Sequence, residues 1–398
     1  MSARAVHKPE LPFNSAIFVW ARERRHHSVE DAAKRVGTSP GAVRAWESGE
    51  AKPTVRQART LAEFYDRSFL EFFREEPPEI TESDLLPDYR LHRGVPEPTE
   101  SRDLLDIQSW AETARLNLID LFDILGEQIP KVPVDLRAKL SENPEVAAAR
   151  TREAIGFRHQ EQIGLKKPLR DLLPKVFRDK LEGAGILVLK AGALAKFGAR
   201  GLCIYADPFP VIVFSSEANS AQLFTMAHEL GHVALGESAI SGPPPSKGGV
   251  SPGRIVEQWC NSFAAALLVP ADDLAQLRIM PDRPAQRIGD PELTILAHRY
   301  GVSRHAMLLR LIELRYVDAA FYWNEKRAEF IEQEAQFKGG GRSKYYGSRF
   351  RSNLGDRYTG TVLEAWGSGR ITNHNAAEFM GTKNIRHVED IRDNYATG

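Results

Sequence analysis

The stretch AQLFTMAHELGHVALGE, residues 221–237, decides the fold of the central part of the chain. Its apolar residues recur at helical spacing, and His228, Glu229 and His232 occupy positions i, i+1 and i+4. Because residues four apart lie on one face of a helix, the two histidines can present ring nitrogens to one metal ion. Glu229 projects beside them, where its carboxylate can take a proton from a metal-bound water. The pattern predicts a catalytic metal site.

A catalytic zinc ion needs a third protein ligand and an open fourth position. The chain has two cysteines, too few for a Cys-based site, so a downstream Glu or His is required. The segment EQWCNSFAAALLVP, residues 257–270, has helical spacing and begins with Glu257, twenty-five residues beyond His232. An antiparallel pair of helices would bring Glu257 to the metal. Asn261, one turn further on, could hydrogen-bond a ligand and fix its orientation.

An alternative interpretation treats the two histidines as partly buried core residues, because Met226, Leu230 and Val233 already give this helix an apolar stripe. Two features favour the metal instead. A Glu between the histidines is costly on a purely packed face. Gly231 weakens the helix unless another element must approach it closely. We therefore predict a metal site and keep buried histidines as the alternative.

These two segments resemble the ImmA/IrrE family of metallopeptidases, whose motif pairs an HExxH helix with a downstream Glu and an N-x-F-A-A-x-L-L-x-P segment. The likeness covers about residues 145 to 315. It implies that His228, His232 and Glu257 bind one zinc ion per chain and that Glu229 is the catalytic base. It also implies hydrolysis of a peptide bond in a protein substrate, typically a DNA-binding repressor.

Three short β-rich runs punctuated by Gly and Pro, residues 183–192, 201–207 and 209–216, predict a small sheet directly before the His-Glu helix. Tyr205, on the second run, could donate a hydrogen bond to the oxyanion of the reaction. After the helix, residues 237–253 are rich in Pro, Gly and Ser, which predicts a mobile loop.

The whole chain is predicted to be α+β and mostly helical. We expect an N-terminal all-α helix-turn-helix domain, a central zincin-like peptidase domain with a small sheet, and a C-terminal helical module. The predicted boundaries are 1–80 for the first domain, 81–143 for a linker and a long helix, 144–320 for the peptidase domain and 321–398 for the tail and module. The clearest boundary is the run of Pro and charged residues at 74–101.

The N-terminal segment has the spacing of a helix-turn-helix. Ser28 can cap one helix, Gly37 allows a tight turn, and Ser39 with Pro40 can begin the second helix. Together with WESGEAKP, residues 46–53, this segment resembles the Cro/C1 (XRE) class of DNA-binding domains. Trp46 is expected in the core.

In the Cro/C1 class the first residues of the second helix enter the major groove, so the resemblance implies DNA contacts by Ser39, Gly41 and Arg44. From residue 14 to residue 74 there are eleven Lys and Arg against eight Asp and Glu, which is a weak electrostatic footprint. Specific binding would require a homodimer, since one recognition helix contacts few base pairs. The alternative is a helical bundle of the same shape that docks protein instead of DNA.

The tail contains a basic, aromatic and Gly-rich stretch at residues 337–353. We favour a solvated linker to the last helices; the alternative is an arm that binds a partner or nucleic acid. Residues 369–391 resemble C-terminal segments of long XRE plus ImmA/IrrE proteins, which are often encoded beside toxins with PIN-type nuclease domains. This resemblance motivates a second hypothesis. The chain would be an antitoxin and repressor that binds operator DNA and holds a toxin with its tail, while the peptidase domain is weakly active or structural.

The composition limits the remaining possibilities. Lys plus Arg equals Asp plus Glu at 53 each, so net charge gives no argument for a nucleic-acid or membrane partner. Two cysteines exclude a disulfide scaffold and are consistent with a reducing compartment. No apolar stretch approaches a membrane-spanning length and the first residues lack the pattern of a signal peptide. We therefore expect a cytoplasmic protein with no membrane partner.

Overall fold

The computed structural model describes residues 13–24, 27–65, 69–73, 102–165, 169–197, 199–241, 252–279, 285–335 and 346–396. The chain divides into two compact units, Met1–Leu85 and Leu86–Gly398. Helices dominate both, and the second unit also contains one small sheet, so the predicted α+β, mostly helical class is confirmed. Within the described part of the chain, every helix is too short or too polar to span a lipid bilayer.

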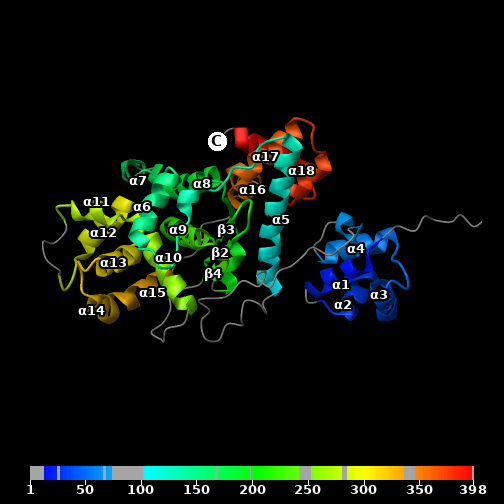
Figure 1. Ribbon diagram of the computed structural model, residues 1–398, viewed down its shortest axis with the longest axis horizontal. Helices are drawn as coiled ribbons and strands as arrows, with labels where there is room; N and C mark the ends of the chain where they lie inside the picture. The colour runs from blue at the N-terminus through cyan, green and yellow to red at the C-terminus, as the bar shows by residue number, and fades with distance from the viewer. Residues whose placement is uncertain are drawn as a thin grey trace, which may run out of the picture. The chain divides into compact units, whose positions relative to one another are not determined.

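The first unit is all-α in its described part. Its elements are α1 Ser15–Arg24, α2 Val29–Val36, α3 Pro40–Glu47, α4 Val55–Tyr65 and the 3-10 helix η1 Phe69–Phe73 (Figure 1).

Side-chain caps and a glycine turn define α2 and α3, as the sequence predicts. The Ser28 hydroxyl accepts a hydrogen bond from the Asp31 amide at 3.0 Å and forms a capping box. Gly37 ends α2 in the left-handed conformation with φ of 71°. Ser39 caps α3 and Pro40 follows at its first position. Trp46 is buried in the core of this unit, which confirms its expected place.

The second unit contains the remaining helices. In chain order these are α5 Arg102–Leu125, α6 Pro144–Ala154, α7 His159–Gly164, α8 Leu173–Gly183, α9 Asn219–Leu235, α10 Pro252–Leu268, α11 Ala271–Ala275, α12 Asp290–Tyr300, α13 Arg304–Glu313, α14 Ala319–Phe321, α15 Arg327–Ala335, α16 Tyr346–Leu354, α17 Asp356–Gly367, α18 Asn373–Phe379 and α19 Ile385–Ala396. Short 3-10 helices are η4 Val134–Leu136, η5 Leu169–Leu172 and η6 Gly192–Phe197, and η7 Tyr322–Lys326 is a π-helix.

The sheet has four strands in the order β1-β3-β2-β4. Strands β1 Leu187–Lys190, β2 Gly201–Ile204 and β3 Val211–Phe214 are the three that the sequence predicts. β1 is parallel to β3, and β2 is antiparallel to both β3 and β4.

The fourth strand corrects the sequence analysis. β4 Ala239–Ser241 lies in the stretch predicted as a mobile loop, so that prediction is wrong for these three residues. The strand forms because its backbone pairs with β2, a tertiary contact that overrides the loop composition of a segment too short to show alternation. Residues 242–251 of the predicted loop lie outside the described part of the chain.

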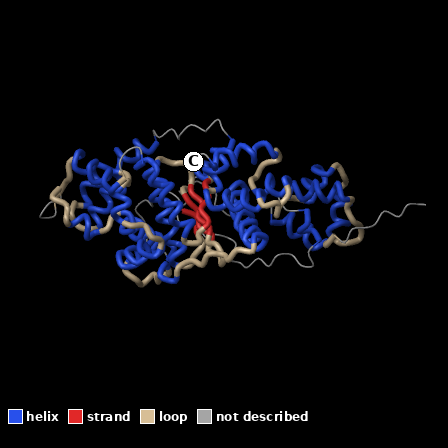
Figure 2. The backbone as a smooth tube through the Cα atoms, turned by 90° about the horizontal axis from the view of Figure 1, so that it is seen from above, coloured by secondary structure: helices blue, strands red, loops and turns tan. Residues whose placement is uncertain are grey.

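Two hydrophobic cores lie on the two faces of this sheet. Val188 and Cys203 point into the first core, which contains residues of α6, α8, α9, α10, α12 and α13. Leu189 and Leu202 point into the second core, which contains residues of α5 and of α16 to α19. Figure 2 shows the strands in red with helices on both sides. The His-Glu helix α9 therefore packs directly against the face of the sheet that borders the first core.

The C-terminal helices α16 to α19 pack on the face of the sheet that borders the second core. The sequence predicts a solvated linker for residues 337–353, but from Tyr346 onward this stretch is α16, which packs against α19 and β1. The linker prediction is thus wrong for that part, and residues 336–345 lie outside the described residues. The physical reason is that the second face of the sheet is apolar and needs helices to exclude water from it.

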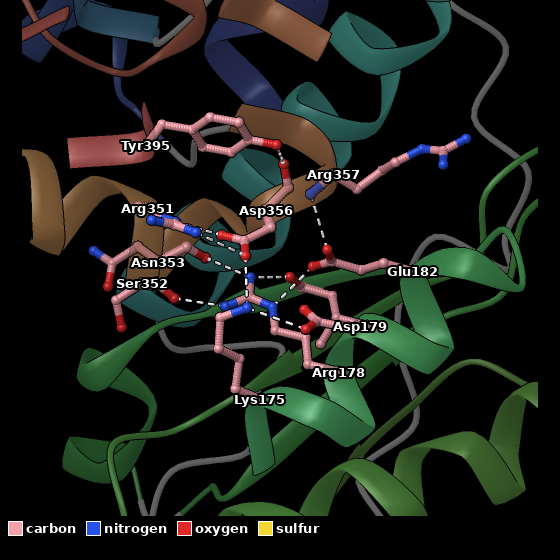
Figure 3. Close-up of polar contacts among 11 residues, drawn as sticks. Lys175, Arg178, Asp179, Glu182, Arg351, Ser352, Asn353, Asp356, Arg357 and Tyr395 are labelled. Atoms are coloured by element: carbon pink, nitrogen blue, oxygen red, sulfur yellow. Dashed lines mark hydrogen bonds and ion pairs between the residues drawn. The ribbon is translucent and has the colours of Figure 1, made fainter. Parts of the chain in front are cut away.

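A buried ion pair on α8 holds the junction between α16 and α17 (Figure 3). The chain turns there at Gly355, whose φ is 87°. Arg178 donates from Nη1 to the carbonyl of Ser352 at 2.6 Å, near the C-terminus of α16. Glu182, 2.9 Å from Arg178 Nε, accepts from the amide of Arg357 in the first turn of α17 at 2.9 Å. Each charge lies at the helix end whose dipole attracts it.

Candidate metal centre

Helices α9 and α10 pack against each other in antiparallel directions. As the residue number rises along α9, the number of the facing residue on α10 falls. His228 lies beside Asn261, Gly231 beside Cys260, and His232 beside Glu257. At Gly231 an added Cβ would lie 3.2 Å from the Cα of Cys260. The close approach that the sequence analysis inferred from this glycine is present.

The donor atoms of two histidines and one glutamate converge between these helices. His228 Nε2 lies 3.3 Å from Glu257 Oε2, His232 Nε2 lies 3.1 Å from Glu257 Oε1, and the two Nε2 atoms are 3.2 Å apart. All three side chains are buried, with exposed fractions of 3%, 0% and 1%. Among the described residues these three form the group of His, Cys, Asp and Glu that could hold a metal ion.

The donor set fits a zinc ion. Ligands about 2.0 to 2.2 Å from a tetrahedral zinc ion lie about 3.3 to 3.6 Å apart, and the three observed separations are close to that range. Two imidazoles and a carboxylate are also the ligand types of catalytic zinc sites, which leave one position open for water or substrate. Burying this set without a metal would leave polar groups crowded together at a cost in stability.

Asn261 fixes the tautomer of one histidine. His228 Nδ1 lies 3.0 Å from Asn261 Oδ1. An amide oxygen only accepts hydrogen bonds, so Nδ1 carries the proton and Nε2 keeps its lone pair directed at the other two donors. This contact is of the kind that orients metal ligands in known sites.

Glu229 lies on the sheet side of the site and is fully buried. Its carboxylate packs against Gly201 of β2. Burial, together with the nearby charge of Glu229, raises the pKa of the Cys203 thiol on the same strand well above its ordinary value. Cys203 therefore remains a neutral thiol. The Glu229 carboxyl faces this part of the sheet.

Three buried side chains hold the C-terminal end of α10, and sequence reasoning missed all three. Arg152 donates to the carbonyl of Leu267 and Gln162 to that of Leu268. Arg310 Nε donates to the carbonyl of the next residue, Val269, at 3.0 Å.

Burial lowers the pKa of Arg152 to about 10, so the guanidinium stays charged at neutral pH. Carbonyls at a helix end need partners, but the sequence does not indicate which distant side chains supply them. These contacts fix the helix that carries Glu257.

Tyr205 is the residue that the sequence suggests as a donor to the oxyanion. Its ring packs against Gly236 at the C-terminal end of α9, and the Arg137 guanidinium lies 5.7 Å from the ring centroid. These contacts lie one turn beyond His232. The role of Tyr205 stays a prediction.

The three residues expected to contact DNA lie in the first two turns of α3 or at its start. Gly41 is exposed, and the Ser39 hydroxyl accepts from the Ala42 amide as the helix cap. Arg44 is 63% exposed and forms an ion pair with Glu30 of α2 at 2.9 Å. An exposed pair of this kind contributes little and exchanges readily with a phosphate.

Models of two known protein families match this chain, one in each of its two units. Residues 182–311 match the model of the IrrE N-terminal-like domain, a metallopeptidase family, and residues 20–72 match a helix-turn-helix family. A search of curated proteins gives no match to this chain. The protein therefore combines a metallopeptidase-like domain with a DNA-binding domain. More particularly, residues 182–311 are similar to the IrrE N-terminal-like domain, and the helix-turn-helix match precedes them in the chain.

Proposed function

We propose that the chain is a zinc-dependent endopeptidase that cleaves a protein substrate, a transcriptional repressor, and that the N-terminal domain brings it to DNA. The observation that carries the proposal is the convergence of His228, His232 and Glu257 at a buried point beside Glu229. The family match covers all four residues. The repressor as substrate is supported by the resemblance to ImmA/IrrE peptidases and by the DNA-binding domain on the same chain.

The four residues have different roles in the proposed hydrolysis. His228, His232 and Glu257 would hold the zinc ion, and Asn261 keeps His228 in the tautomer that binds it. Held by these residues, a zinc ion would supply Lewis-acid chemistry: it would polarise a peptide carbonyl and would lower the pKa of a water molecule towards about 7. Glu229 accepts the proton of the attacking water and passes it to the leaving amine.

Removal of the metal tests this function. In cells that produce the full chain, we expect new protein N-termini in a repressor, detected by mass spectrometry of terminal peptides. With purified chain and that repressor, a zinc chelator should abolish the cleavage and added zinc should restore it, because Glu229 alone supplies only part of the catalysis. Cleavage that persists in chelator at the original rate would contradict the proposal.

DNA binding is tested separately with the full chain on sequences selected from a random pool. Replacing Arg44 with Ala should weaken binding about 10-fold and reduce the salt dependence by about one phosphate contact, since one exposed guanidinium is lost from the recognition helix. Arg386→Ala removes the same charge from an exposed position on α19 and is the control. Equal affinities of the two variants would contradict a role of α3 in binding.

The antitoxin hypothesis gives a different result in these experiments. Under that hypothesis the chain binds operator DNA, and it produces few or no new N-termini with or without zinc, because the peptidase domain is weakly active or structural. The metal content of the purified chain then decides whether the peptidase domain retains a structural metal.

A further inference from the structure

Gly201, the first residue of β2, lies directly against the side chain of Glu229. An ideal Cβ built on Gly201 would be 2.2 Å from Glu229 Oε1, 2.7 Å from Cδ and 2.9 Å from Cγ. Real Cβ atoms do not approach other heavy atoms this closely. The conflict is not confined to the carboxylate oxygen at the tip of the glutamate side chain. It also involves Cδ and Cγ, which lie nearer the backbone.

The backbone of Gly201 does not require glycine. Its φ lies outside the left-handed region, and the residue has ordinary strand conformation in a strand whose residues are all buried. A glycine in a strand has no side chain to pack, and it often marks a close approach by another group. Space for Glu229 is therefore the physical reason for the missing side chain.

Neither element can move away to accept a larger residue. β2 is paired on both sides, with Gly201 opposite Phe214 of β3 and opposite Ser241 of β4. On the other side, α9 is held against α10 at Gly231 and Cys260. Because both backbones are fixed, an added methyl group at position 201 would be accommodated by rotation of the Glu229 side chain.

We propose that Gly201 is a positioning residue for Glu229: the absent side chain leaves the space that holds the carboxylate in the orientation from which it takes a proton. The catalytic meaning of this inference rests on the proposed function. The packing relation between the two residues does not, and it can be measured in protein without metal.

The first test is a double-mutant cycle on thermal stability of the metal-free full chain. Gly201→Ala should lower the melting temperature by about 2–4 °C or more, because it displaces a buried carboxylate. In the Glu229→Ala background the same change should be neutral or stabilising, because the conflicting atoms are gone and alanine suits a strand better than glycine. Gly183→Ala is the control, since an added methyl group there meets no described atom within 4 Å. Equal effects of Gly201→Ala in both backgrounds would overturn the inference.

The second test reports on the orientation of the carboxylate. Protein loaded with cobalt(II) is titrated with pH, and the midpoint of its visible absorption change is compared among variants. Gly201→Ala should keep the metal content of the wild type and shift the midpoint towards that of Glu229→Ala, with no further shift in the double variant. A midpoint equal to that of the wild type would show a packing role alone and overturn the positioning role.

The experiments distinguish failure of this inference from failure of the proposed function. If the chain binds no metal and cleaves nothing, the peptidase proposal fails, while the stability cycle still decides whether Gly201 holds Glu229. If the chain is an active zinc peptidase and the cycle shows no coupling, the peptidase proposal stands and this inference fails.

Discussion

Glu229→Gln is expected to lower the rate of peptide hydrolysis by about 10²–10⁴-fold while the protein keeps its zinc. Glutamine has the shape of glutamate and fits the space beside Gly201, but it cannot accept a proton at neutral pH. Because Glu229 is outside the group of three converging ligands, its replacement leaves the metal donors in place. The rate and the zinc content are measured on the same preparation.

The control for this variant is Glu389→Gln, the same change on the exposed surface of α19. It should retain the wild-type rate. Loss of zinc from Glu229→Gln would show that Glu229 is a ligand, and a rate within about 3-fold of wild type would exclude it as the base, because general-base catalysis contributes far more than that.

Arg178→Ala is expected to destabilise the second unit by about 3–5 kcal/mol, the largest stability effect that we predict. The change leaves the buried Glu182 carboxyl without its guanidinium partner, and it removes the hydrogen bond to Ser352 at the end of α16. The junction of α16 and α17 at Gly355 would then lack the charge that caps the first of the two helices. Chemical denaturation followed by circular dichroism measures the change in the free energy of unfolding.

Lys175→Ala provides the matched comparison for Arg178. Lys175 lies one turn earlier on α8 and pairs with Asp179 and Asp356, but its side chain is 47% exposed. Pairs at this exposure are screened by water, so the loss should be at most about 1 kcal/mol. Equal losses for the two variants would contradict the assignment of Arg178 and Glu182 as the pair that fixes the C-terminal helices.

The parts of the fold that depend on local chemistry could be predicted from the sequence. Ser28 and Ser39 cap their helices through contacts within three residues, and the spacing of His228 and His232 places both on one face of a single helix. Glu257 required one further assumption, an antiparallel second helix, and the structure brings it to the two histidines.

The remaining features depend on contacts between segments far apart in the chain. β4 forms only because β2 is available to pair with it. α16 forms a helix over a stretch with linker composition because it covers an apolar face of the sheet. The approach of Gly201 to Glu229 joins a strand and a helix whose register no local pattern indicates. Sequence periodicity carries no information on such pairings.

The most direct test of the metal centre is the zinc content of the purified full chain and its variants, measured by mass spectrometry after dialysis. We predict about one zinc ion per chain in the wild type and loss of zinc from His228→Ala and Glu257→Ala, as a site with three protein ligands requires. Asn261→Ala should keep the site with about 10–100-fold lower affinity, because it releases the ring of His228. A wild-type chain without metal, with His228→Ala and Glu257→Ala variants of equal stability, would contradict the account and show that the histidines are packing residues.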